Sequence, residues 1–214
     1  MGGTQRRPSE RVAKLVDGYV AVTIPVYIDV DVEQTILSEQ EAEEILCSAE
    51  TIASGRCAYR TEAGKCDAPL DICIAVGGDA EEMLAKYEGF CVISREDALA
   101  ALRVSHEGGL VHLAFRRGNG EITQLCSCRS CCWFLDKPKG CDFGEAIIES
   151  NYVGRHDRKA YVGCGNRIDR CHLTAWTPNS DGEPRLVTET CFGCGICVAS
   201  CTANAISLEA RPKT

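Results

Sequence analysis

The hydrophobic pattern of the first half of the chain switches between the two-residue period of a strand and the longer period of a helix. Apolar residues occupy every second position over 20–30, which predicts a half-buried strand that is interrupted near Pro25. A capping box at 38–41 precedes apolar residues at helical spacing, so a helix is expected as far as Gly55.

Four further elements are predicted before the cysteine-rich part of the chain. Helices are expected from Asp79 to Gly89 and from Ser94 to Gly108, because each stretch begins with capping residues and ends at glycine. Strands over 110–115 and 121–126 are joined by a turn-rich segment, which is typical of a hairpin.

The order of these elements predicts the fold class and the domains. A strand, then helices, then strands is typical of an α+β fold. We expect an N-terminal arm and short helix over 1–18, followed by a small, cysteine-rich α+β domain with α/β-sandwich-like layers over 19–150. After Cys126 cysteines dominate and apolar periodicity fades, so residues 151–214 are expected to form a C-terminal domain organised around metal.

Cysteine is the unusual feature of the composition, with 16 cysteines among 214 residues. Many are only one to three positions apart, no secretory signal is recognisable at the start, and no run approaches the roughly 18 apolar residues of a membrane span. Metal-bound thiolates in a reduced, cytoplasmic setting therefore fit better than disulfides. The net charge of −8 disfavours nucleic acid as a partner and suits docking to basic patches of redox partners.

The most specific motif is C-x2-C-x2-C-x3-C, formed by Cys191, Cys194, Cys197 and Cys201. This is the bacterial ferredoxin run, in which a short loop presents three thiolates to three irons of a 4Fe–4S cluster. Glycines between the cysteines allow the tight turns that such a loop needs. A zinc knuckle is the alternative, although structural zinc usually takes two separated cysteine pairs.

A second, altered copy of the motif lies thirty residues earlier. It retains Cys164 and Cys171, whereas its other two cysteine positions hold Tyr161 and Arg167, which are not usual ligands. In two-cluster ferredoxins the fourth cysteine of each run ligates the other cluster. Cys171 is then expected to complete the intact cluster, which leaves Cys164 and Cys201 at a site without half of its ligands. Local ligation by Cys201 is the competing possibility.

Two more groups of cysteines are candidate metal ligands. Cys57, Cys66 and Cys73 are expected to supply three ligands of a cluster or zinc site that is completed from 126–132. The alternative is that these three are scattered loop cysteines. Two isolated cysteines, Cys47 and Cys91, are predicted to be core residues. No catalytic constellation is recognisable around the four histidines. The first group is Cys126, Cys128, Cys131 and Cys132, with Cys141 beyond, and the second is Cys57, Cys66 and Cys73.

Most of the chain resembles bacterial and archaeal 4Fe–4S dicluster-type proteins with a ferredoxin domain at the C-terminus. The resemblance implies a ferredoxin-like fold for the C-terminal domain and two ferredoxin motifs. The chain departs from that pattern at Tyr59, Arg129, Tyr161 and Arg167, where such proteins often have cysteine, so one cluster is expected and a second metal is a hypothesis. The segments that carry the resemblance are IPVYIDVDV (24–32), CAYR to KCDAPLDIC (57–73), GLVHLAF (109–115), CSCRSCC (126–132) and CFGCGICVASC (191–201).

These observations define three hypotheses about function. The leading one is an iron–sulfur electron-transfer protein, or the electron-input subunit of a multi-subunit oxidoreductase complex, with at least one 4Fe–4S cluster and no catalytic residue of its own. The alternative is a reductase enzyme, in which a non-standard, incompletely cysteine-ligated cluster binds a small substrate. The third is a structural interaction module that holds zinc together with a cluster.

Overall fold

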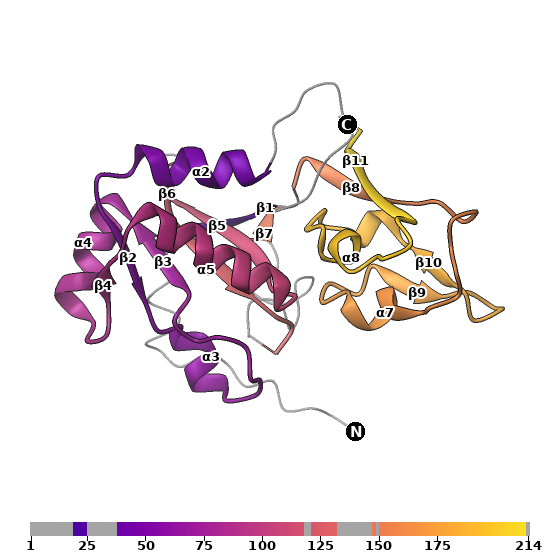
Figure 1. Cartoon of the computed structure of the whole chain (residues 1–214), viewed down its shortest axis with the longest axis horizontal. Helices are drawn as coiled ribbons and strands as arrows, with labels where there is room; N and C mark the ends of the chain where they lie inside the picture. Colours follow the sequence, from indigo (N-terminus) through magenta and orange to yellow (C-terminus); the bar gives the residue numbers. More distant parts are fainter. Residues whose placement is uncertain (1–18, 25–37, 118–120, 132–146, 149, 213–214) are drawn as a thin grey trace.

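The computed structural model describes residues 19–24, 38–117, 121–131, 147–148 and 150–212 (Figure 1). The predicted arm and helix over 1–18 lie outside these residues, as do Cys132, Cys141 and the predicted strand beyond Ile24. None of the described helices is both long and apolar enough to cross a membrane.

Among the described residues, seven strands form one sheet in the order β4-β2-β3-β6-β5-β1-β7. Neighbouring strands run antiparallel, except β1 and β7, which are parallel. The hairpin expected from the sequence is confirmed as β5 and β6. The strands are β1 (Tyr19–Ile24), β2 (Ile52–Gly55), β3 (Cys73–Val76), β4 (Cys91–Val92), β5 (Val111–Arg117), β6 (Ile122–Cys128) and β7 (Ile147–Ile148).

Helices cover both faces of this sheet (Figure 1). On one face, α2 and α5 pack through Leu46 and Leu102 against Ile74 of β3. On the other face, α4 packs through Ala80 against Ala75, the next residue of the same strand. Consecutive residues of a strand point to opposite faces, so β3 contributes to both cores. The helices are α2 (Ser38–Ser48), α3 (Ala58–Ala63), α4 (Gly77–Lys86) and α5 (Arg95–Glu107).

Three expectations about this domain are wrong. The helix expected as far as Gly55 ends at Ser48, and Ile52–Gly55 is strand β2, because it is buried throughout and pairs with β3 on one side and β4 on the other. Cys47 and Cys91 are exposed rather than core residues. Cys47 directly follows the buried Leu46 and therefore faces outward from α2, and Cys91 lies on the edge strand β4.

The described C-terminal part of the chain contains two small antiparallel sheets, two short α-helices and one 3-10 helix. In one sheet β8 pairs with β11, and in the other β9 pairs with β10. The fold class α+β is thus confirmed for the described residues as a whole. The elements are β8 (Tyr152–His156), α7 (Asn166–Arg170), β9 (Trp176–Pro178), β10 (Pro184–Leu186), the 3-10 helix η2 (Thr188–Thr190), α8 (Ile196–Ala199) and β11 (Ile206–Ala210).

Backbone features of this part recur at an offset of thirty residues. The amide of Ala175 donates to the sulfur of Cys171, and the amide of Ala205 donates to the sulfur of Cys201, both at 3.2 Å. The internal repeat predicted from the sequence is therefore confirmed in the backbone. Positive φ angles also occur in matching pairs, at Gly163 and Gly193, at Gly165 and Gly195, and at Thr174 and Asn204.

Candidate functional site

Four cysteines of the C-terminal part lie together, three from the intact run and Cys171 from the altered copy. Burial is the largest cause that raises the pKa of the Cys194 thiol, and the charges of Cys197, Cys171 and Cys191 raise it further. Burial also raises the pKa of Cys197 to about 12, against a hydrogen bond with Trp176 that lowers it. Cys191 and Cys171 add to the increase at Cys197. The structure thus places Cys171 among the cysteines of the intact run.

Backbone amides point at two sulfurs of this group. Gly154 donates to the Sγ of Cys191 at 3.4 Å, and Ala175 donates to the Sγ of Cys171 at 3.2 Å. Amide hydrogen bonds favour a thiolate over a neutral thiol. Cys201 follows α8 and is half-buried, and its sulfur accepts from the amide of Ala205. Cys164 is exposed.

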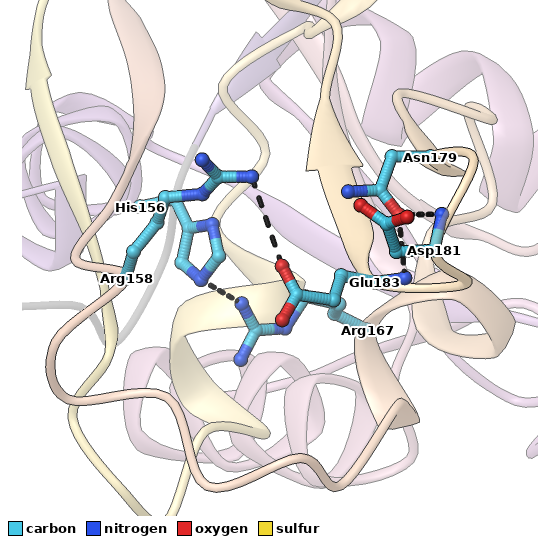
Figure 2. A network of polar contacts seen from close by, with 6 residues as sticks. All are labelled: His156, Arg158, Arg167, Asn179, Asp181 and Glu183. Carbon is cyan, nitrogen blue, oxygen red and sulfur yellow. Dashed lines mark hydrogen bonds and ion pairs between the residues drawn. The ribbon is translucent and has the colours of Figure 1, made fainter.

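In the altered copy of the motif, Arg167 stands at one of the two positions without cysteine, and its guanidinium packs against two aromatic rings. Arg167 is 3% exposed, and its guanidinium carbon lies 4.2 Å from the ring centre of Tyr161 and 5.1 Å from that of Trp176. Its Nη1 donates to Nε2 of His156, as Figure 2 shows. The Tyr161 hydroxyl accepts from the amide of Gly165 at 3.1 Å. Tyr161 and Arg167, at the two positions where the motif lacks cysteine, thus form a cation–π stack.

The surroundings of His156 keep its imidazole neutral. Partial burial is the largest cause that lowers the pKa of His156, followed by the positive charges of Arg167 and Arg158. A neutral ring leaves Nε2 free to accept from Arg167. Arg158 itself is exposed. It forms an ion pair at 3.8 Å with Glu183, which is also exposed (Figure 2).

A second group of four cysteines lines a cavity of about 520 Å³ in the N-terminal domain. Cys57 directly precedes α3, Cys73 begins β3, and the remaining two are at the end of β6. Pairing of Ile74 with Leu125 places Cys73 opposite Cys126 one step further along the two strands. Register in the hairpin places Cys126 opposite Leu113, on the same face of the sheet. The four cysteines on this cavity are Cys57, Cys73, Cys126 and Cys128.

The thiols of this group influence one another strongly. A hydrogen bond with Cys126 lowers the pKa of Cys73, and the nearby Arg60 lowers it as well, against the effect of burial. The same hydrogen bond and burial raise the pKa of Cys126. Burial, followed by the charges of all four cysteines, raises the pKa of Tyr59, so its phenol stays neutral.

The remaining predicted ligands are placed elsewhere or lie outside the described residues. Cys66 packs with Ala68 and Leu110 and does not line the cavity. Cys131 is half-buried just beyond β6 and does not line the cavity either. Cys132 is outside the described residues. Of the seven cysteines predicted as metal ligands in this half of the chain, the structure brings four together.

A histidine beside Cys171 connects the two halves of the molecule. Nε2 of His172 donates to the carbonyl of Gly109 at 2.9 Å, which leaves Nδ1 to accept from the Ser130 hydroxyl at 3.2 Å. The C-terminal cysteine group is thereby held against the start of β5 and the segment that follows β6.

Each of the two groups offers four cysteine sulfurs as candidate ligands. Within the described residues, no three His, Cys, Asp or Glu side chains are grouped as ligands of one metal ion. A single zinc ion holds each thiolate at about 2.3 Å, whereas each thiolate of a cluster binds a different iron and stands farther from the others.

Sequence reasoning missed Arg60, which is 2% exposed and lines the N-terminal cavity. It lies in α3, a helix that the sequence did not predict, and an arginine is not expected to be buried from its residue type alone. No protein-family model, no curated protein and no solved structure matches this chain.

Proposed function

We propose that the C-terminal part of the chain, with a ferredoxin-like fold, holds one 4Fe–4S cluster through Cys171, Cys191, Cys194 and Cys197. The chain then serves as an electron-transfer protein, alone or as the electron-input subunit of an oxidoreductase complex. The observation that carries the proposal is the position of Cys171 beside three cysteines that lie twenty or more residues later in the chain.

The chemistry of the four side chains supports this proposal. Burial raises the pKa of Cys194 and Cys197, so without a cation both would remain neutral thiols. A metal centre supplies the positive charge that makes thiolates stable in such surroundings. Amides aimed at the sulfurs of Cys191 and Cys171 contribute in the same direction.

The proposed function needs no catalytic residue. A bound 4Fe–4S cluster supplies a one-electron couple, in which the electron received from one redox partner is the electron passed to the next. The residues around it exclude water, hold the ligands in place and set the charge nearby. Arg167 contributes a buried positive charge against the ring of Trp176, the side chain that also hydrogen-bonds to Cys197, and this charge favours the reduced, more negative state of the couple.

Iron, sulfide and zinc analysis of anaerobically purified protein, with EPR spectra before and after dithionite, tests the proposal. We expect Cys171→Ser to lose about four irons and one reduced cubane signal relative to the wild type, since this cluster type contains that many. The matched variant Cys201→Ser is expected to keep both. Loss of the signal from Cys201→Ser alone would make Cys201 the fourth ligand, and wild-type protein with zinc and no iron would overturn the proposal.

A further inference from the structure

Arg60 is a buried cation whose three guanidinium nitrogens, Nε, Nη1 and Nη2, have no hydrogen-bond partner among the described residues. A guanidinium is charged at every pH that proteins encounter. An isolated buried charge is strongly unfavourable, and natural proteins pair or coordinate such groups. The surroundings of Arg60 therefore indicate that an anion belongs beside it.

The space next to Arg60 is the cavity of about 520 Å³ that four cysteines also line. These cysteines come from three places in the chain, before α3, at the start of β3 and at the end of β6. Sheet register holds the last two places together, because β3 and β6 are antiparallel neighbours. The arrangement is therefore built into the sheet rather than into one mobile loop.

We propose that Cys57, Cys73, Cys126 and Cys128 hold a second iron–sulfur cluster, with Arg60 as its counter-cation. Four thiolates carry more negative charge than the oxidised core of a 4Fe–4S cluster carries positive charge, so the assembly is anionic. Such an anion gives the Arg60 guanidinium the partner that the described side chains do not provide. The proposal goes beyond the C-terminal cluster and does not depend on it.

The cavity and its neighbours favour a cluster over zinc. Zinc bound by four thiolates is compact and has no redox chemistry. The cavity is far larger than one ion requires, and one apolar cluster of side chains joins the two cysteine groups. Buried side chains from both halves of the chain belong to this apolar cluster, namely Cys126, Cys128, Phe192 and Ile196. Partly buried side chains from both cysteine groups pack against it, namely Tyr59, Cys73, Cys171 and Cys194. A second one-electron centre at this position lies close to the first behind a water-excluding layer.

The position of Tyr59 is consistent with a site in which the four cysteines supply all the ligands. Tyr59 lines the same cavity as the four cysteines, and a bulky phenol side chain is not a usual cluster ligand. Tyr59 therefore forms part of the wall of the site, while Arg60 supplies its charge.

Metal analysis of the full-length protein tests the inference directly. We expect the anaerobically purified wild type to contain about eight irons and eight sulfides per chain, as two 4Fe–4S clusters require. The double variant Cys73→Ser/Cys126→Ser is expected to contain about four, all of them lost on further replacement of Cys194 and Cys197. The matched control Cys47→Ser/Cys91→Ser removes two exposed cysteines of the same domain and is expected to match the wild type.

Two independent measurements guard against a variant that does not fold. Dithionite-reduced wild type is expected to give an EPR signal that integrates to about two spins per chain, with broadening from coupling between neighbouring clusters. Replacement of Arg60 by Gln is expected to shift the potential of the second centre to more negative values, because the cation favours the reduced state, and Arg60→Lys is expected to retain most of it. Arg56→Gln, at an exposed arginine of the same cavity, is the matched control.

The outcomes separate this inference from the proposed function. Equal iron in the wild type and in Cys73→Ser/Cys126→Ser would overturn the inference, as would the loss of about one zinc in place of iron. Iron that disappears with the Cys73 and Cys126 replacements but is unaffected by Cys194→Ser/Cys197→Ser would support the inference and overturn the C-terminal assignment. An unchanged potential in Arg60→Gln would refute the role of Arg60 as counter-cation.

Discussion

Replacement of Arg167 by methionine examines whether the cation–π stack stabilises the C-terminal part of the protein. Methionine keeps the length and much of the volume of the side chain but removes its charge and its hydrogen bond to His156. The two ring contacts contribute on the order of 1–3 kcal/mol together, and the hydrogen bond from a charged donor contributes about 1.5 kcal/mol. Relief of the desolvation of Arg167 offsets part of this loss. We expect a net destabilisation of about 2 kcal/mol, within the usual range for a disrupted buried network.

The assay is thermal unfolding of the anaerobic, metal-loaded protein at one fixed scan rate. For a chain of this length, about 2 kcal/mol lowers the Tm by roughly 4–8 °C. Arg158→Met is the matched control, because Arg158 belongs to the same network but its side chain is 70% exposed and its ion pair with Glu183 is at the surface. Exposed pairs contribute about 0–1 kcal/mol, so its Tm is expected to fall by no more than about 4 °C.

The dependence on pH provides a second check of the same reasoning. The folded-state pKa of His156 lies below its unfolded value, chiefly through burial and then through Arg167. The stabilisation that needs a neutral His156 is therefore complete above about pH 6.5 and is lost as the pH falls through the lowered folded pKa. The difference in Tm between wild type and Arg167→Met should shrink on acidification. Equal melting of the two proteins at neutral pH would refute the stabilising role of the stack.

Three further perturbations follow from the structure. Burial lowers the pKa of His112 to about 3, so wild-type stability should fall by up to about 1.4 kcal/mol per pH unit below pH 6.5, and His112→Gln should flatten this slope in pH-dependent urea titrations. Gly193→Ala should abolish the C-terminal cluster signal, because φ is +68° and a Cβ would collide with the backbone of Tyr152, whereas Gly163→Ala, with φ of +79° and open space, should lose only about 1–2 kcal/mol of stability. Arg211→Leu removes donors to three backbone carbonyls around the intact cysteine run and should accelerate bleaching of the cluster absorbance in air.

Local features of the sequence were sufficient for the helices with clear caps and for the motif. The Ser94 hydroxyl accepts from the amide of Asp97 and begins α5 as expected. Apolar alternation on both sides of a turn predicted the hairpin of β5 and β6. The thirty-residue repeat was readable because cysteines and glycines are required at fixed offsets wherever a short loop wraps around a metal.

Short buried strands were beyond local reasoning. Ile52 and Ala53 fit a helical pattern as well as a strand, and only pairing with β3 and β4 decides between the two. β3 itself is four residues long and is buried on both faces, so no alternation reveals it. An exposed position such as Cys47 is decided by which face of α2 meets the sheet, which depends on partners distant in the sequence.

The chain by itself determined which cysteines of the intact run are candidate ligands, because their spacing is a local property of one loop. Tertiary structure decided which distant cysteines join one another. It placed Cys171 beside the intact run, and it selected Cys57 and Cys73 but not Cys66 to face the end of β6. The register of β3 against β6 fixes the place of Cys73, since a shift by one residue would turn Cys73 to the other face of the sheet. The burial of Arg60 is likewise decided by tertiary packing, because the sequence specifies the charge of a side chain but not its solvent exposure.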